Sequence, residues 1–252
     1  MSKIRFNVIT IFPKIFDSYF GESIIKRAIK KKKAEIKVHN LRDFSNDKKH
    51  QKARPTKPAQ KIHSGGWSFG RVDDKPYGGG AGMVLMAGPI LRAVKSLGRS
   101  ASKSKQKVVI FSAKGKPFNQ KMAHDWSKKY NNFIFVTGRY EGIDERVAKI
   151  LKAEEISIGP YITTDGDVAA MVVVSALTRL IPDVINWSSL EDESFLRQEL
   201  KKEAKLKEKQ LEYPHYTRPE ILSWGGKKYK VPSVLLSGDH AKINSWRDRQ
   251  RK

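Results

Sequence analysis

Two short apolar runs, uninterrupted by any polar side chain, constrain the fold of this 252-residue chain most strongly. They are residues 108–111 (VVIF) and 133–136 (FIFV), and a helix-like stretch over 119–130 separates them. A strand with one face in solvent would alternate apolar and polar residues, so these runs indicate strands that are covered on both faces. Strands that alternate with helices are typical of an α/β domain with a mainly parallel sheet.

The same alternation continues through most of the first 180 residues. Residues 4–8 alternate as a strand does, and Pro13 suits the first turn of a helix. Further strands are expected over 35–41, 107–111, 132–136 and 155–158, and further helices over 22–33, 90–97, 119–130, from near Ile143, and over 167–180. Residues 42–82 are polar and rich in Gly, Pro and Lys, which predicts a long loop.

The periodic pattern ends near Pro182, and we expect the first domain to comprise residues 1–182. Acids followed by Lys/Glu repeats (KKEAKLKEK) fill 183–212, which we interpret as a charged linker. Residues 213–252 then predict a small, mainly helical second domain, with an apolar segment over 231–236 and a helix from about Asp239.

The charge of the chain favours a polyanionic partner. There are 50 Lys and Arg against 26 Asp and Glu, a formal net charge of +24, and basic residues cluster in 26–33 and in 48–61. Nucleic acid phosphates attract such side chains and release counterions when bound.

Several classes of site are disfavoured by what the sequence lacks. Cysteine is absent, which excludes disulfides, zinc thiolates and cysteine nucleophiles, and the six histidines show no metal-ligand spacing. The most apolar stretch, 168–177, is shorter than the ~20 residues of a membrane span, and no signal peptide precedes the first strand. We expect a cytoplasmic protein with no membrane partner.

Three expected strands each run into a loop that contains glycine: 112–115 (SAKG), 137–146 (TGRYEGIDER) and 159–167 (GPYITTDGD). In parallel α/β sheets, ligands bind at the carboxyl ends of strands, where such loops meet. Glycine lets backbone N–H and C=O groups approach a ligand closely. No G-x-G-x-x-G follows a strand, and neither a P-loop nor a G-x-S-x-G elbow occurs, which disfavours several common enzyme classes.

Six ordered blocks carry a resemblance to a known family. They are VDDKPYGGGAGM (72–83), VTGRYEGIDERV (136–147), EEISIGPYITTDGD (154–167), LTRLIP (177–182), LEYPHYTRPEIL (211–222) and VPSVLLSGDHAKINSWR (231–247). Together, and over nearly the whole chain, they resemble the bacterial tRNA (guanine-N1)-methyltransferases of the TrmD family, in the SPOUT class.

The resemblance implies a SPOUT-type parallel sheet in which residues 108–182 thread a deep trefoil knot, an exceptional feature among folds. It implies a homodimer with active sites at the subunit interface, and a C-terminal domain that binds tRNA. The implied reaction transfers a methyl group from S-adenosyl-L-methionine to N1 of the guanosine at tRNA position 37, next to the anticodon. Dependence on magnesium is implied as well, although the sequence shows no magnesium site.

By the same resemblance, the cofactor lies among the glycine-containing loops. The expected contacts are Ser112, Gly138, Tyr140, Gly142, Ser157, Ile158, Gly159, Pro160, Tyr161, Ile162, Thr163 and Gly166. Two residues depart from the family pattern, because Asp165 stands where a glycine is common and Pro160 where an acid is common. We expect Asp165 to point to solvent.

Methylation at guanine N1 requires removal of a proton, which a positioned carboxylate can accept. Negative charge then develops on O6, where an arginine can stabilise it. The resemblance assigns the arginine to Arg179 and the base to the acid directly before Ser194-Phe195. Alignment on Ser-Phe makes Glu193 the base, whereas a shift of one residue, which keeps aspartate chemistry, makes it Asp192. We favour Glu193.

The resemblance also suggests where the substrate binds. Tyr77, Gly78, Gly79, Gly80 and Gly82 are expected to form the floor of a guanine pocket, because single-stranded RNA bases are read in tight pockets. His215 and Arg218 are expected to contact the anticodon stem, and the basic stretch 48–71 either adds phosphate contacts or stays disordered. Two other functions remain open, namely a SPOUT-like ribosomal RNA methyltransferase and a non-catalytic RNA-binding protein.

Overall fold

The computed structural model of the chain describes residues 3–46, 70–98, 105–186 and 212–251. The chain divides into two compact units, Met1–Ile185 and Asn186–Lys252. Most of the predicted linker, 183–212, lies outside the described residues, so the domain limits stay a prediction. Within the described ranges, no helix is both long and apolar enough to span a membrane.

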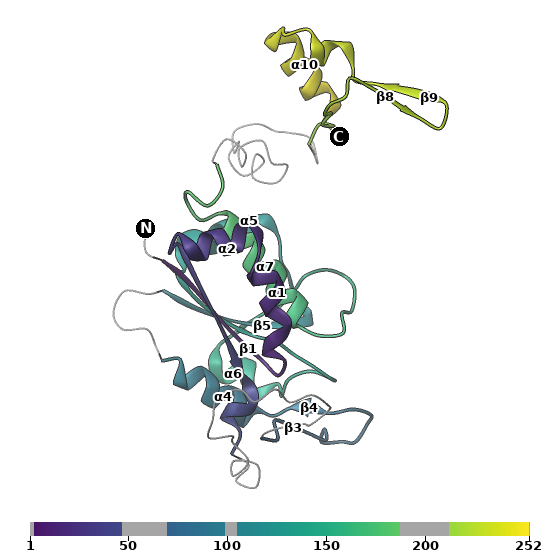
Figure 1. Cartoon of the computed structure of the whole chain (residues 1–252). Helices are drawn as coiled ribbons and strands as arrows, with labels where there is room; N and C mark the ends of the chain where they lie inside the picture. Colours follow the sequence, from purple (N-terminus) through teal and green to yellow (C-terminus); the bar gives the residue numbers. More distant parts are fainter. Residues whose placement is uncertain (1–2, 47–69, 99–104, 187–211, 252) are drawn as a thin grey trace, which may run out of the picture. The chain divides into compact units, whose positions relative to one another are not determined.

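A five-stranded sheet forms the centre of the first unit (Figure 1). Every neighbouring pair of its strands is parallel, which confirms the predicted α/β class. The spatial order is β2 (Ala34–Asn40), β1 (Ile4–Thr10), β6 (Asn132–Val136), β5 (Gln106–Pro117) and β7 (Glu154–Ser157).

Helices cover both faces of this sheet, as the uninterrupted apolar strands require. One face, with Phe6 and Phe133, packs against η1 (Pro13–Phe16), α1 (Asp17–Phe20), α2 (Ser23–Lys30), α5 (Gln120–Lys129) and α7 (Asp167–Arg179). The other face, with Ile9 and Ile134, packs against η2 (Leu41–Phe44), α4 (Ala87–Ser96) and α6 (Arg146–Leu151) (Figure 1). The core therefore has two layers, one on each side of the sheet.

Strand β5 is interrupted where the first glycine-containing loop was predicted. Its register against β7 shifts between Phe111 and Lys116, so the intervening residues leave the ladder. The first part of the strand ends at the residue predicted from the apolar run. Residues 112–115 consequently form an irregular segment of β5, directly after the buried residues of the strand.

The residues that follow α7 are held by basic side chains at the end of α2. Arg27 donates a hydrogen bond to the carbonyl of Val184 (3.0 Å), and Lys31 to the carbonyl of Asp183 (3.0 Å). Lys33 forms an ion pair with the Asp183 carboxylate at 2.7 Å. Part of the basic cluster over 26–33 therefore bonds to the chain itself.

The second unit contains a hairpin and a helix. Strands β8 (Ile221–Trp224) and β9 (Lys227–Lys230) pair antiparallel, followed by η3 (Ser233–Leu236) and α10 (His240–Gln250). The Asp239 carboxylate accepts a hydrogen bond from the Lys242 amide (3.1 Å), which caps α10 and confirms the predicted helix start. The hairpin was not predicted from the sequence.

Candidate active site

The three glycine-containing loops surround one cavity at the carboxyl end of the central sheet. Its volume is about 590 Å³, within the range of small-molecule sites. Ten of the predicted cofactor contacts line it: Ser112, Gly138, Tyr140, Gly142, Ser157, Ile158, Tyr161, Ile162, Thr163 and Gly166. The other two, Gly159 and Pro160, are not among the lining residues.

Charged side chains that the sequence analysis did not single out also line this cavity. They are Lys114, Arg139, Glu141, Glu145 and Glu155. The hydrogen bond between Lys114 and Glu145 raises the pKa of the lysine and lowers the pKa of the carboxyl. Three of these residues belong to the GRYEGIDER block. The many charged residues next to glycines in that block could have predicted that charged side chains line the cavity.

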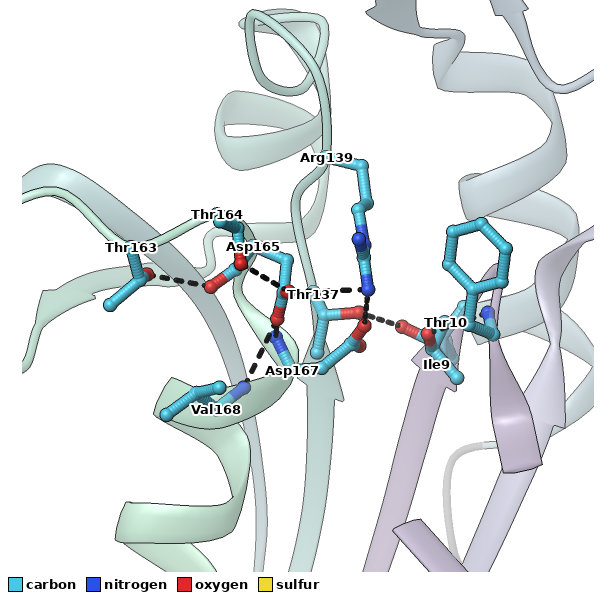
Figure 2. A network of polar contacts seen from close by, with 10 residues as sticks. Ile9, Thr10, Thr137, Arg139, Thr163, Thr164, Asp165, Asp167 and Val168 are labelled. Carbon is cyan, nitrogen blue, oxygen red and sulfur yellow. Dashed lines mark hydrogen bonds and ion pairs between the residues drawn. The ribbon is translucent and has the colours of Figure 1, made fainter. Parts of the chain in front are cut away.

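Asp165 is buried, so the prediction that it points to solvent is wrong. Its Oδ1 accepts hydrogen bonds from the amides of Asp167 (2.8 Å) and Val168 (3.3 Å) at the start of α7. Its Oδ2 accepts one from the Thr164 hydroxyl (3.0 Å) and lies 3.2 Å from the Arg139 guanidinium (Figure 2). The carboxylate turns inward because it satisfies helix-terminal amides and the mostly buried Arg139 cation.

Arg139 joins the second loop to the third. Figure 2 shows its guanidinium directed at two carboxylates, Asp165 and Asp167. It donates a hydrogen bond to Asp167 Oδ2 at 2.8 Å, and Asp167 is fully buried. The guanidinium also lies 4.5 Å from the centre of the Phe12 ring. This mostly buried cluster fixes the spacing of two loops that line the cavity.

The second and third loops also touch through their backbones. The amide of Gly166 donates a hydrogen bond to the carbonyl of Gly138 at 2.9 Å. A Cβ atom at Gly166 would lie 2.8 Å from the Gly138 nitrogen, which is closer than any side chain tolerates. Glycine at 166 is therefore required by this close approach.

The glycine-rich segment docks against the second loop. It connects the short strands β3 (Asp73–Asp74) and β4 (Val84–Leu85), which pair antiparallel. The Leu85 amide donates to the Gly142 carbonyl (2.9 Å), and the Glu141 amide donates to the Met83 carbonyl (3.1 Å). The predicted guanine-binding segment and the predicted cofactor loop are thus adjacent.

The tip of this segment forms an open loop. Gly78, Gly79 and Gly80 have φ values of 87°, 79° and 113°, which favour glycine, and an added Cβ would meet nothing within 4 Å at any of them. Tyr77 is fully exposed. Gly82, in contrast, lies against the Glu141 side chain. Within one chain, the first four of these predicted substrate residues therefore do not enclose a pocket.

The structure does not bring the predicted catalytic residues to the cavity of the same chain. Arg179 is the last residue of α7, whereas Ala169 is the last α7 residue that lines the cavity. About 15 Å of helix axis separate the two, from the rise per residue of an α-helix. Asp192 and Glu193 lie outside the described residues.

The remaining predicted site residues lie in the second unit. His215 and Arg218 are both exposed there, and the His215 ring lies 4.6 Å from the Tyr213 ring. Among the residues that the structure describes, no group of three or more His, Asp or Glu side chains could hold a metal ion.

A parallel α/β sheet with a ligand-sized cavity at its carboxyl edge is the arrangement of α/β proteins that bind small molecules through strand-end loops. A family model described as "tRNA (Guanine-1)-methyltransferase TrmD" matches residues 4–56 and 67–252. The chain belongs to the TrmD family of tRNA methyltransferases.

Curated relatives agree with this assignment. A tRNA (guanine-N(1)-)-methyltransferase of Clostridioides difficile (strain 630) is 42% identical over 245 residues, which cover 97% of this chain and 90% of that protein. The protein of the same name from Carboxydothermus hydrogenoformans is 40% identical, with coverages of 98% and 82%. That of Mycoplasma capricolum is 38% identical, with coverages of 98% and 87%.

Proposed function

We propose that this chain methylates N1 of guanosine 37 in tRNA and takes the methyl group from S-adenosyl-L-methionine, in the cytoplasm. The observation that supports this most is the cavity of about 590 Å³ lined by ten of the twelve residues assigned to the cofactor by family resemblance. The deep trefoil knot over 108–182, which the family resemblance implies, is part of the proposal.

The residues around the cavity fit this methyl donor. Glycine-containing loops offer backbone donors and acceptors for the edge of an adenine, and Glu141, Glu145 and Glu155 offer carboxylates to a cationic amino acid sulfonium. When bound, S-adenosyl-L-methionine supplies an activated methyl group. The role of the chain is to hold the donor beside the glycine-rich segment that contacts Glu141.

We further propose a homodimer in which each active site combines two subunits. Arg179 lies too far along α7 to reach the cavity of its own chain, so a partner must supply it. An exposed apolar face of unit 1 suits self-association. Its side chains are Phe12, Ile15, Tyr19, Val168 and Val172, each about 40% exposed. Val168 and Val172 share one side of α7, and η1 packs against that helix.

In the proposed reaction, a carboxylate before Ser194 accepts the proton of guanine N1 while the methyl group is transferred to that nitrogen. Arg179 stabilises the negative charge that develops on O6. Both groups act on the base, and neither is needed to hold the methyl donor.

The proposed activity is tested with purified protein, labelled S-adenosyl-L-methionine and tRNA transcripts that carry guanosine or adenosine at position 37. Label is expected only in the guanosine transcript. Transfer to ribosomal RNA instead would support the first alternative function, and RNA binding without transfer would support the second. Parallel reactions with and without added Mg²⁺ test the implied magnesium dependence.

Glu193→Gln is expected to lower kcat more than Asp192→Asn, by about 10²-fold or more, since general base catalysis typically contributes ~10²–10⁴-fold. Each change removes only the ability of one neighbouring side chain to accept a proton, so the pair is a matched control. Single-turnover kinetics at saturating tRNA provide the measurement. The opposite ranking would move the base to Asp192.

A further inference from the structure

The hairpin β8–β9 leaves an unusual amount of apolar surface uncovered. All of its strand residues are exposed, including Trp224 at 76%, Tyr229 at 54% and Leu222 at 52%. An isolated two-stranded hairpin is marginally stable in water, and an exposed apolar patch commonly marks a binding surface. The hairpin therefore has the character of an element that binds a partner.

The strand register sorts the side chains of the hairpin into two faces. Trp224 pairs with Lys227 and Leu222 pairs with Tyr229, and alternation along each strand places these four residues on one face. Gly225 and Gly226, with φ values of 58° and 74°, form a two-residue turn that keeps the two strands in this register. We name the face that carries Leu222, Trp224, Lys227 and Tyr229 the aromatic face.

The positive charge of the hairpin favours a negatively charged partner. Residues 221–230 contain three lysines and no acid. Residues 212–251, the described part of the second unit, contain eight Lys and Arg against four Asp and Glu. Aromatic side chains interleaved with lysines are the composition that binds single-stranded nucleic acid, since bases stack on the rings and cations meet the phosphates.

We infer that the aromatic face of β8–β9 is an RNA-binding surface, on which an unpaired base of the tRNA stacks against Trp224 while the hairpin lysines contact the flanking phosphates. This inference rests on the proposed function, because it takes tRNA as the RNA partner. The surface contributes to tRNA affinity and not to methyl transfer. It differs from the segment of His215 and Arg218, which precedes the hairpin.

The experiment measures tRNA affinity with the full-length protein. Trp224→Ala is expected to weaken binding of a tRNA transcript by about fivefold or more, because about fivefold is the lower end of what stacking of one base on an aromatic ring contributes. Trp224→Phe keeps a π-face and is expected to restore most of the affinity. The adjacent Ser223→Ala lies on the opposite face and is expected to behave as wild type. In Trp224→Ala, KM for tRNA should rise while kcat stays unchanged. The affinity for S-adenosyl-L-methionine should also stay unchanged.

The outcomes separate this inference from the proposed function. Equal tRNA affinity of Trp224→Ala and wild type, with methyl transfer intact, overturns the inference alone. A change of dimer content or melting temperature in Trp224→Ala, without a change in tRNA affinity, means that the face packs on protein and also overturns it. Wild type that binds tRNA but transfers no methyl group overturns the proposed function, while the affinities of the variants still decide the role of the hairpin.

Discussion

Arg179→Ala is expected to lower kcat for tRNA methylation by about 10²–10³-fold, the usual effect of removing one group that stabilises a developing oxyanion. Affinity for S-adenosyl-L-methionine should survive, because Arg179 is not among the residues that line the cavity. Single-turnover kinetics and calorimetric titration measure the two quantities separately. Equal loss of turnover and of cofactor affinity would contradict the assigned role.

A mixing experiment tests whether Arg179 acts across the subunit interface. Gly138→Leu is the second variant, because Gly138 lines the cavity and a Cβ there meets only ordinary contacts, the nearest at 3.6 Å. Each variant alone is expected to be inactive. Co-refolded in equal amounts, they should recover roughly a quarter of wild-type activity, since half of the dimers are mixed and each mixed dimer has one complete site. No recovery would place Arg179 in the site of its own chain.

Arg139→Ala is expected to destabilise the first unit by about 3 kcal/mol, because it leaves two buried carboxylates without their cation. For a unit of this size, that corresponds to a fall of about 6–12 °C in melting temperature. Affinity for S-adenosyl-L-methionine should weaken by at least about tenfold, since the two loops that Arg139 joins are no longer preorganised. Differential scanning calorimetry and equilibrium titration measure these effects.

Arg146→Ala is the matched control for that substitution. Arg146 belongs to the same sequence block, but its side chain is 69% exposed and pairs with the carboxylate of Asp144. Exposed ion pairs contribute little to stability, because water screens them. Arg139→Ala and Arg146→Ala with the same melting temperature and the same cofactor affinity would show that the buried cluster does not organise the cavity.

Local patterns were enough to predict most of the central sheet. Strand β6 begins and ends at the predicted residues, because a strand covered on both faces admits no polar side chain over 133–136. Long-range contacts explain where the prediction failed. The helix expected from near Ile143 begins at Arg146, because Ile143 instead forms a parallel bridge with Leu85. Strand β3 lies inside the predicted loop 42–82, and its partner β4, just beyond that loop, contains the Leu85 of this bridge.

The candidate site was predictable in its loops but not in its interior. Glycines after strands indicated which loops line the cavity, whereas the inward turn of Asp165 depends on Arg139, 26 positions earlier, and on the amides of α7. No local pattern reports such a pairing. The hairpin β8–β9 did have a local signal, the pair Gly225-Gly226 between strand-forming residues.

Because of the ion pair between Lys33 and Asp183, the formal charge of +24 overstates how strongly the chain attracts RNA. An RNA phosphate that captured Lys33 would leave Asp183 without its counterion, so the net gain from that lysine is small. The salt dependence of tRNA binding should accordingly reflect fewer displaced ions than the number of lysines implies. Some of the basic residues of this enzyme therefore stabilise its own fold through ion pairs and are not free to bind a substrate.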